Sequence, residues 1–218
     1  MIEKILPSGV AAQDVFEDVL DEPLFPEEQA AIARAVDKRQ REFRTVRACA
    51  RAALQEFGLT RTPMVPGTRG APPWPPGIVG SMTHCAGYRA AAVARAGEFL
   101  GLGLDAEPDQ PLPEGVLAAI ARPEELDWLA EHHGDRSVCW DRLLFSAKES
   151  VYKTWYPLTG RFLEFEEASL VFDPDAQTFR ATLLVEGPTL TGNTLTGFTG
   201  RWLVDRGLLV TCVLLPAG

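Results

Sequence analysis

The sequence predicts an α+β fold, because helical patterns and strand patterns are grouped along the chain rather than strictly alternated. Three strand-like runs follow one another in the first half, at residues 78–83, 88–95 and 99–105. Four more close the chain, at residues 168–172, 179–186, 198–204 and 208–215. Helical patterns precede each group, so the predicted order is β-α-α-β-β-β-α-α-α-β-β-β-β.

The N-terminal region predicts a short strand at residues 2–6 and then two helices. Pro26 and the two glutamates after it are typical of a helix start, since proline fits the first helical position and acids favour the N-terminal end of the helix dipole. A second helix is expected from residue 37 to residue 57. Gly58 would end it at the position where helices often carry a left-handed glycine.

A long loop rich in proline and glycine is predicted for residues 63–77. This composition fits neither a regular helix nor a central strand. Loops of this length without regular structure are uncommon and often functional. In the second half, Pro157 is expected to end the last of three helices, predicted at residues 113–120, 123–132 and 140–156.

Composition and charge exclude several classes of protein. The chain has 218 residues and a formal net charge of −9, enough length for one large domain or two small ones. An acidic protein binds nucleic acid only weakly without sequence specificity, because attraction to phosphate needs a basic surface. We expect no membrane partner either, since no apolar run approaches the roughly 20 residues that span a bilayer. No secretory signal is recognised at the N-terminus, and four widely spaced cysteines without a CxxC pattern are typical of free thiols in the cytoplasm.

Two carboxylates, Asp105 and Glu107, end a hydrophobic strand. Positions i and i+2 of a strand point to the same face, so the two side chains are expected to project together. Neighbouring anions repel each other and favour a divalent cation, and oxygen ligands suit Mg²⁺. On this motif alone a solvated strand end remains the alternative, because such tripeptides are frequent.

A predicted helix carries Lys148, Glu149 and Lys153. Glu149 and Lys153 are four residues apart, so a surface ion pair worth about 0.3 kcal/mol is one interpretation. In the other, Glu149 is a third metal ligand or a general base, and the two lysines meet phosphate oxygens.

Two further features are candidates for anion binding. His84 stands at the end of an apolar strand, where a structural role is the alternative to donation to a phosphate. Residues 38–51 contain 6 of the 21 lysines and arginines of the chain. Arg44, Arg47 and Arg51 fall on one helical face, which is either solvated or, given this concentration in an acidic chain, an anion site.

Taken together, these segments resemble Sfp-type 4′-phosphopantetheinyl transferases. Residues 103–107 (GLDAE) and 145–153 (FSAKESVYK) are similar to the two signature motifs of that family, and the separation 149 − 105 = 44 is in the expected range. Residues 80–89 resemble its histidine segment and residues 42–51 its arginine helix. The resemblance spans about residues 16 to 215 and is closest to the actinobacterial, mycobacterial-type branch.

The resemblance implies a pseudo-dimer of two α+β halves in one monomeric chain, residues 1–101 and 102–218, with coenzyme A and metal between them. It also implies an enzyme that moves phosphopantetheine from coenzyme A to a serine of an apo acyl or peptidyl carrier protein, releasing 3′,5′-ADP. Such carrier proteins serve fatty acid, polyketide and nonribosomal peptide synthesis.

The resemblance further implies residue roles. Mg²⁺, or Mn²⁺ in its place, would be held by Asp105, Glu107 and Glu149, with Glu149 also acting as base and Lys153 assisting the departing 3′,5′-ADP. The positions that match coenzyme A contacts are Arg39, Arg47, Arg69, Thr83, His84, Lys148 and Lys153. The chain departs from the family in its loop, where Arg69 is the only cation in residues 65–72, and at Ala106, whose side chain cannot bind metal.

Two other functions use the same residues. One is a Mg²⁺-dependent hydrolase of nucleotide pyrophosphates, with water as the nucleophile. The other is a coenzyme A-binding regulator without catalysis. The lysines on either side of Glu149 and the arginine helix argue against the hydrolase. A pure binder would not need a base and its neighbouring lysine.

Overall fold

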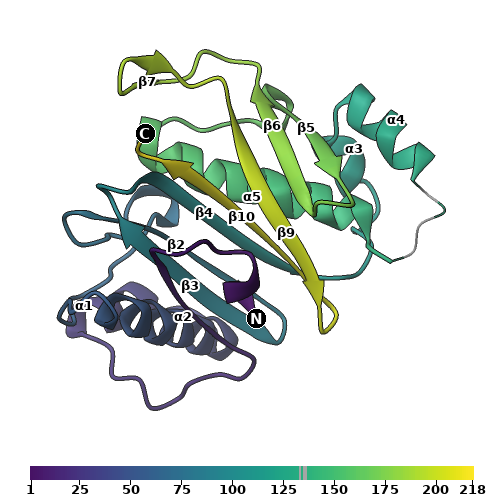
Figure 1. Cartoon of the computed structure of the whole chain (residues 1–218). Helices are drawn as coiled ribbons and strands as arrows, with labels where there is room; N and C mark the ends of the chain where they lie inside the picture. The colour runs from purple at the N-terminus through teal and green to yellow at the C-terminus, as the bar shows by residue number, and fades with distance from the viewer. Residues whose placement is uncertain (133, 135–136) are drawn as a thin grey trace.

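Two antiparallel sheets form the framework of the computed structural model, which describes residues 1–132, 134 and 137–218 (Figure 1). One has three strands in the order β1-β3-β2, and the other has five in the order β4-β10-β9-β6-β5. The strands are β1 (Val10–Val15), β2 (Ile78–Cys85), β3 (Tyr88–Arg95), β4 (Phe99–Pro108), β5 (Ala168–Asp173), β6 (Thr178–Leu183), β9 (Gly197–Asp205), β10 (Leu208–Pro216), and the two short strands β7 (Thr189–Leu190) and β8 (Asn193–Thr194), which pair with each other.

Helices flank both sheets and follow the predicted grouping, so the α+β prediction is confirmed. The α-helices are α1 (Pro26–Ile32), α2 (Asp37–Gln55), α3 (Val116–Ile120), α4 (Pro123–Glu131) and α5 (Trp140–Thr159). Single 3-10 turns are η1 (Ile2–Lys4), η2 (Thr68–Gly70) and η3 (Phe165–Glu167). Among the described helices, none combines the length and the apolar composition that crossing a bilayer requires.

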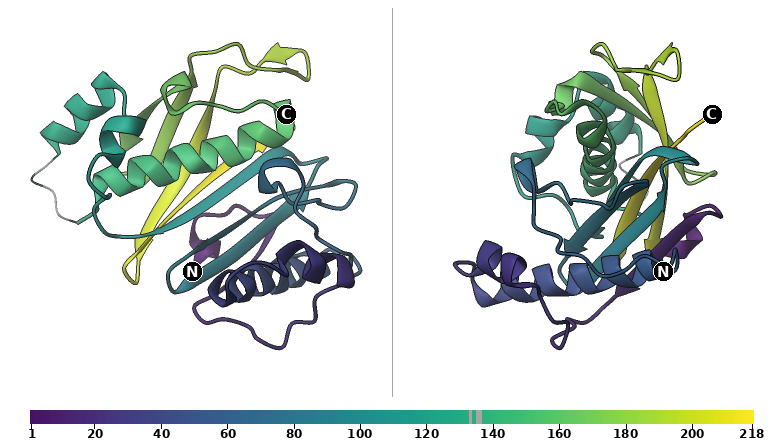
Figure 2. Two further views of the ribbon diagram at one scale, coloured as in Figure 1. Left: turned by 180° about the vertical axis from the view of Figure 1, so that it is seen from behind. Right: turned by 90° about the vertical axis from the view of Figure 1, so that its left-hand side faces the viewer.

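The long helix α2 lies along the lower edge of both views in Figure 2 and the long helix α5 lies above it, each packed against its own sheet. Strand β3 shows how the layers join, because its residues alternate between two apolar clusters. Ala91 and Val93 pack with α2, whereas Ala90 and Ala92 pack toward β4 and β10. A further core fills the space between α5 and the five-stranded sheet, where Val151 and other buried residues of α5 meet the sheet.

The structure differs from the predicted elements in several details. Residues 2–6 do not form a strand, because Ile2–Lys4 is the 3-10 turn η1. Strand β1 was not predicted, and it forms through pairing with β3. Helix α5 continues past Pro157 to Thr159. Proline in the last turn costs one backbone hydrogen bond, and the helix ends instead at Gly160, where φ is 65°.

The two sheets meet where β2 lies along β4, the edge strand of the five-stranded sheet. Ser81 Oγ accepts the N–H of Leu104 at 3.0 Å, and Thr83 Oγ1 accepts the N–H of Ala106 at 3.1 Å. Side chains of β2 thus satisfy backbone donors that an edge strand would otherwise leave unpaired. Because of this junction, the end of β4 lies beside the first half of the chain. Asp105, which is part of this end, lies there too.

Candidate active site

A cavity of about 310 Å³ opens between α2, the Pro/Gly loop, β2 and α5. Its walls therefore come from residues before and after the predicted division at residue 101, which itself falls inside β4 and stays a prediction. Six predicted site residues line it: Arg39, Arg47, Arg69, His84, Glu149 and Lys153.

Asp105 is buried, with only 5% of its surface exposed, so it is not the solvated strand end that the sequence left open. Its Oδ1 accepts from Lys153 Nζ at 2.7 Å and from Thr83 Oγ1 at 3.4 Å. Its Oδ2 is buried and has no hydrogen-bond partner among the residues that the structure describes. A buried carboxylate oxygen without a partner carries a desolvation cost, so it is a vacant ligand position for a cation.

Two more carboxylates share this region with Asp105. Burial raises the pKa of Glu107, and the nearby Asp105 raises it further, against the lowering effect of Arg142. Burial and Asp105 likewise raise the pKa of Glu149. Burial is the larger cause of both raised pKa values, and the repulsion from Asp105 that adds to it is the part that a bound cation would relieve.

As they stand, no three His, Cys, Asp or Glu side chains of the described residues are grouped closely enough to hold a metal ion. Lys153 occupies one oxygen of Asp105, and Arg142 Nη1 lies 2.9 Å from Glu107 Oε2. The donor chemistry nevertheless fits Mg²⁺, since one oxygen of Asp105 is open and the neighbouring ligands are hard oxygens. For three of these carboxylates to hold one ion, the side chains themselves would have to move closer together.

His84 is held in an uncharged form at the cavity wall. Burial lowers its pKa to about 4, and Arg39 lowers it as well. The Arg39 guanidinium contacts His84 Nε2, and because a guanidinium can only donate, Nε2 accepts and the ring proton sits on Nδ1. Glu42, whose role was not predicted, lies 3.5 Å from the same nitrogen.

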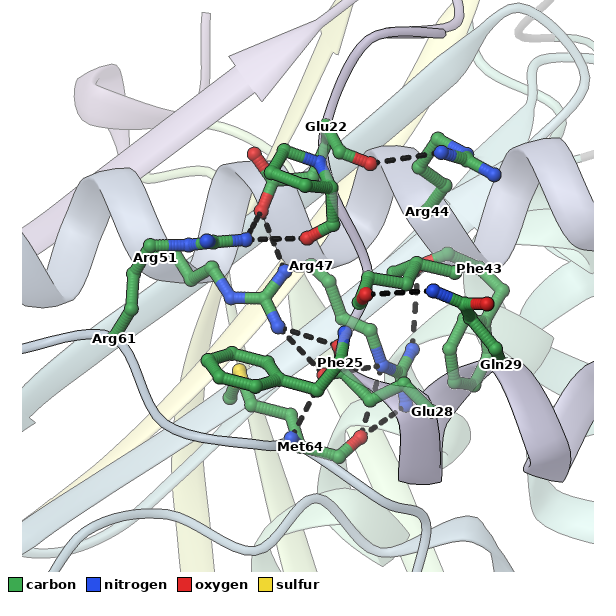
Figure 3. Close-up of polar contacts among 12 residues, drawn as sticks. Glu22, Phe25, Glu28, Gln29, Phe43, Arg44, Arg47, Arg51, Arg61 and Met64 are labelled. Carbon is green, nitrogen blue, oxygen red and sulfur yellow. Dashed lines mark hydrogen bonds and ion pairs between the residues drawn. The ribbon is translucent and has the colours of Figure 1, made fainter.

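The arginine face of α2 is turned toward the protein interior (Figure 3). Arg44 Nη1 donates to the carbonyl of Glu22 at 2.8 Å, and Arg51 pairs with Glu22 and Glu28. Arg47 is also buried and donates twice to the carbonyl of Met64, at 2.9 and 2.8 Å. For Arg51 the anion is thus a carboxylate of this chain, whereas Arg47 also reaches the cavity.

Lys148 lies apart from the other predicted coenzyme A contacts. Its ammonium is 2.8 Å from Glu125 Oε2 and donates to the carbonyls of Phe165 and Ala168. It borders a second cavity of about 140 Å³, which shares Glu149 and Tyr152 with the first. Its proposed contact with coenzyme A stays a prediction, and here the ammonium already has three protein partners.

Other predicted residues are placed as follows. Lys153 pairs with Asp105, so its ammonium is committed to the carboxylate cluster instead of to the surface ion pair with Glu149. Thr83 is buried and faces Asp105. Arg142 was missed, although its position seven residues before Glu149 puts both side chains on one face of α5. That spacing was the signal that could have found it.

Family models and individual proteins both match this chain. A model described as the 4′-phosphopantetheinyl transferase N-terminal domain matches residues 27–94, and one for the 4′-phosphopantetheinyl transferase superfamily matches residues 101–196. The chain is 58% identical to the 4′-phosphopantetheinyl transferase Svp of Streptomyces mobaraensis, over 100% of this chain and 91% of that protein.

Two other relatives are similar over nearly their full length. The transferase Npt of Nocardia iowensis is 48% identical over 98% of this chain and 99% of that protein. The transferase PptT of Mycobacterium tuberculosis is 43% identical over 99% of this chain and 98% of that protein.

Proposed function

Because this chain belongs to the 4′-phosphopantetheinyl transferase superfamily and is a 4′-phosphopantetheinyl transferase, we propose that the cavity between its halves binds coenzyme A and presents it to a carrier protein. The acceptor is a serine of an apo acyl or peptidyl carrier protein. The family assignment decides against the hydrolase and the regulator as the activity of this chain.

Glu149 is the proposed general base. Serine is a weak nucleophile until a base takes its proton, so Glu149 accepts that proton as the serine oxygen attacks the β-phosphorus of coenzyme A. A bond forms between this oxygen and the β-phosphorus, and the bond from the β-phosphorus to the bridging oxygen of the α-phosphate breaks. The support for this role is the position of Glu149, which lines both cavities.

Cations on the cavity wall are proposed to hold the departing group. The bridging oxygen gains negative charge as 3′,5′-ADP leaves, and Lys153 stabilises or protonates it. Arg39 and Arg47 suit phosphate because a guanidinium donates in a fixed fork. The support is their shared position on the wall of the cavity, together with Arg69.

Asp105, Glu107 and Glu149 are the proposed ligands of Mg²⁺. Such an ion would offset two of the three negative charges and polarise the pyrophosphate of coenzyme A. The single observation that carries this assignment is the buried, unpartnered Oδ2 of Asp105 beside two carboxylates whose pKa values are raised.

The test is intact-mass analysis of an apo carrier protein incubated with the chain and coenzyme A. With Mg²⁺ present, we expect a mass increase of one phosphopantetheine group on the serine. With a chelator present, we expect none, and Mg²⁺ or Mn²⁺ in excess should restore it. Transfer at an unchanged rate in the presence of the chelator would remove the metal from the proposal.

We also propose that the chain acts as a monomer, because one chain supplies residues of both halves to the cavity. Sedimentation equilibrium should give the mass of one chain, 23.8 kDa. A stable dimer at assay concentrations would contradict this.

A further inference from the structure

Glu28 is a fully buried carboxylate with 0% of its surface exposed, and no predicted role accounts for it. Its Oε2 accepts the N–H of Phe25 at 2.9 Å, and its Oε1 accepts the N–H of Met64 at 2.8 Å. Arg51 Nη2 donates to both oxygens, at 2.6 and 2.7 Å (Figure 3). Both oxygens are therefore satisfied, which is the condition under which a buried charge is tolerated.

Through these bonds Glu28 fixes a segment that has no strand partner. Met64 is 1% exposed, and the chain around it has no regular secondary structure. Its N–H is held by Glu28 of α1 and its carbonyl by Arg47 of α2. Side chains of two helices thus replace the ladder that would normally satisfy a buried backbone.

The fixed segment leads directly into the wall of the active-site cavity. Pro66 lines that cavity and follows Met64 by two residues, and residues 69–72 continue the wall. Arg47, which holds the carbonyl of Met64, lines the same cavity. The placement of the loop and of Arg47 therefore depends on one carboxylate that lies outside the cavity.

The second half of the chain contains an equivalent arrangement, in which a buried glutamate binds backbone N–H groups and a cation of the following long helix. Glu125 is buried near the start of α4, and its Oε2 accepts the N–H of Arg122 at 2.8 Å. Its Oε1 accepts the N–H of Leu170 at 2.8 Å. Lys148 of the long helix α5 pairs with Glu125 and donates to the carbonyl of Phe165, a residue that lines the second cavity.

The pairs Glu28–Arg51 and Glu125–Lys148 occupy equivalent positions in the sequence. The carboxylates are separated by 125 − 28 = 97 residues, and so are the cations that bind them, 148 − 51 = 97. Each carboxylate follows a proline by two residues at the start of a short helix, and each cation stands on the long helix that comes next. In both halves the glutamate is also the third residue of a capping box, so the same arrangement recurs at the same place in each half of the fold.

We propose that Glu28 is a positioning residue for coenzyme A binding, which holds the loop of residues 64–72 and Arg47 in the geometry that receives the ligand. This inference rests on the proposed function of the cavity. A loop that is already ordered loses less conformational entropy when the ligand binds. Loss of Glu28 should therefore weaken coenzyme A binding and leave the reacting groups on α5 in place.

The experiment compares wild type, Glu28→Gln and the control Glu27→Gln, whose side chain is exposed on the same turn of α1. We expect Glu28→Gln to raise the KM for coenzyme A and its calorimetric Kd by between about 10-fold and 10²-fold. At saturating coenzyme A the kcat should stay within a few-fold of wild type, and the KM for the carrier protein should not change. Glu27→Gln should match wild type in all four values.

A second readout reports on the loop itself. Trypsin cleavage after Arg69, followed by mass spectrometry, should be faster in Glu28→Gln and should slow when coenzyme A is added. A residue with a purely structural role would lower the melting temperature without moving the KM for coenzyme A. An unchanged KM and Kd in folded Glu28→Gln would overturn the proposal, whatever the cleavage rate.

If Glu28→Gln does not fold, Arg51→Lys is judged by the same criteria, since it keeps the charge but loses the second guanidinium nitrogen, so that Glu22 and Glu28 no longer each have a donor of their own. The result for Glu28 can be distinguished from the result for the proposed transfer reaction. A wild-type chain that binds coenzyme A but transfers nothing would count against the proposed reaction, while the Kd values would still decide the role of Glu28.

Discussion

Asp105 is the residue on which the proposed metal site depends, because one of its oxygens pairs with Lys153 and the other has no partner among the described residues. Asp105→Asn keeps the shape of the side chain and its contact with Thr83 but removes the charge. We expect transfer to fall by more than about 10²-fold, since a charged metal ligand is lost. Initial rates from intact-mass analysis would measure this loss.

Glu114→Gln, a change at an exposed carboxylate, is the control for Asp105→Asn and should leave the rate unchanged. A thermal melt of both variants would show that the fold is intact. Turnover close to wild type in Asp105→Asn at ordinary Mg²⁺ concentrations would remove Asp105 from the site.

Glu28 makes a pH-dependent contribution to stability. Burial tends to raise its pKa, but the hydrogen bonds from Arg51 and from the N–H groups of Phe25 and Met64 outweigh burial and lower the pKa below the ordinary 4.5. A carboxyl group with a lowered folded-state pKa stabilises the fold above its unfolded pKa. That stabilisation is lost as the pH falls through the folded value.

Urea denaturation at about pH 7 should therefore show Glu28→Gln to be less stable than wild type by about 2–4 kcal/mol, because Arg51 loses a buried partner. The difference should shrink as the pH falls below 4.5. Glu27→Gln should show no such difference at either pH. An equal gap between wild type and Glu28→Gln at neutral and strongly acidic pH would contradict the argument.

At the scale of elements, two glycines allow α5 to lie against β4. A Cβ added at Gly103 would be 2.0 Å from the carbonyl oxygen of Ser150 and 2.3 Å from Thr154 Oγ1. At Gly101 it would be 2.9 Å from Thr154 Cγ2. The contact at Gly103 involves helix backbone, so α5 itself would have to move, and with it Glu149.

We expect Gly103→Ala to lower the free energy of unfolding by about 1–3 kcal/mol, the usual cost of overpacking. Transfer should fall more than the folded fraction does, because Glu149 and Lys153 move away from Asp105. Gly97→Ala is the matched control, since a Cβ there meets nothing within 4 Å. A Gly103→Ala variant with normal stability and normal transfer would show that the close approach is dispensable.

The predicted elements agreed with the structure where a local pattern controls the outcome. Strands β2, β3 and β4 are short runs separated by turn glycines, helix α2 has apolar residues at helical spacing, and each forms near its predicted position. Strand β1 has small and polar residues and is defined by its pairing with β3, which the sequence does not reveal locally. The extension of α5 through Pro157 depended on the cap at Gly160.

At the scale of the whole molecule, the resemblance to 4′-phosphopantetheinyl transferases implied which residues would come together, and six of them line one cavity. It could not predict which cations already have partners inside the protein. Lys148 and Arg51 look like phosphate ligands in the sequence, yet their carboxylate partners lie about 20 residues upstream, on the preceding short helices. Only the packing of those helices brings each pair together.

The two halves together form the site, and α5 carries the residue at its centre, since Glu149 lines both cavities. The central claim is that Glu149 takes the proton from the carrier-protein serine at this junction. Glu149→Gln keeps the shape and one oxygen of the side chain but removes its charge and basicity. We expect coenzyme A still to bind, while transfer falls by about 10²–10⁴-fold.

The most direct measurement is the transfer rate of Glu149→Gln in single-turnover reactions, followed by intact mass at saturating coenzyme A and across a range of Mg²⁺ concentrations. The account predicts that the rate stays low at every Mg²⁺ concentration, while the calorimetric Kd for coenzyme A remains within a few-fold of wild type. Recovery of the wild-type rate at high Mg²⁺ would contradict it, because Glu149 would then act as a metal ligand alone.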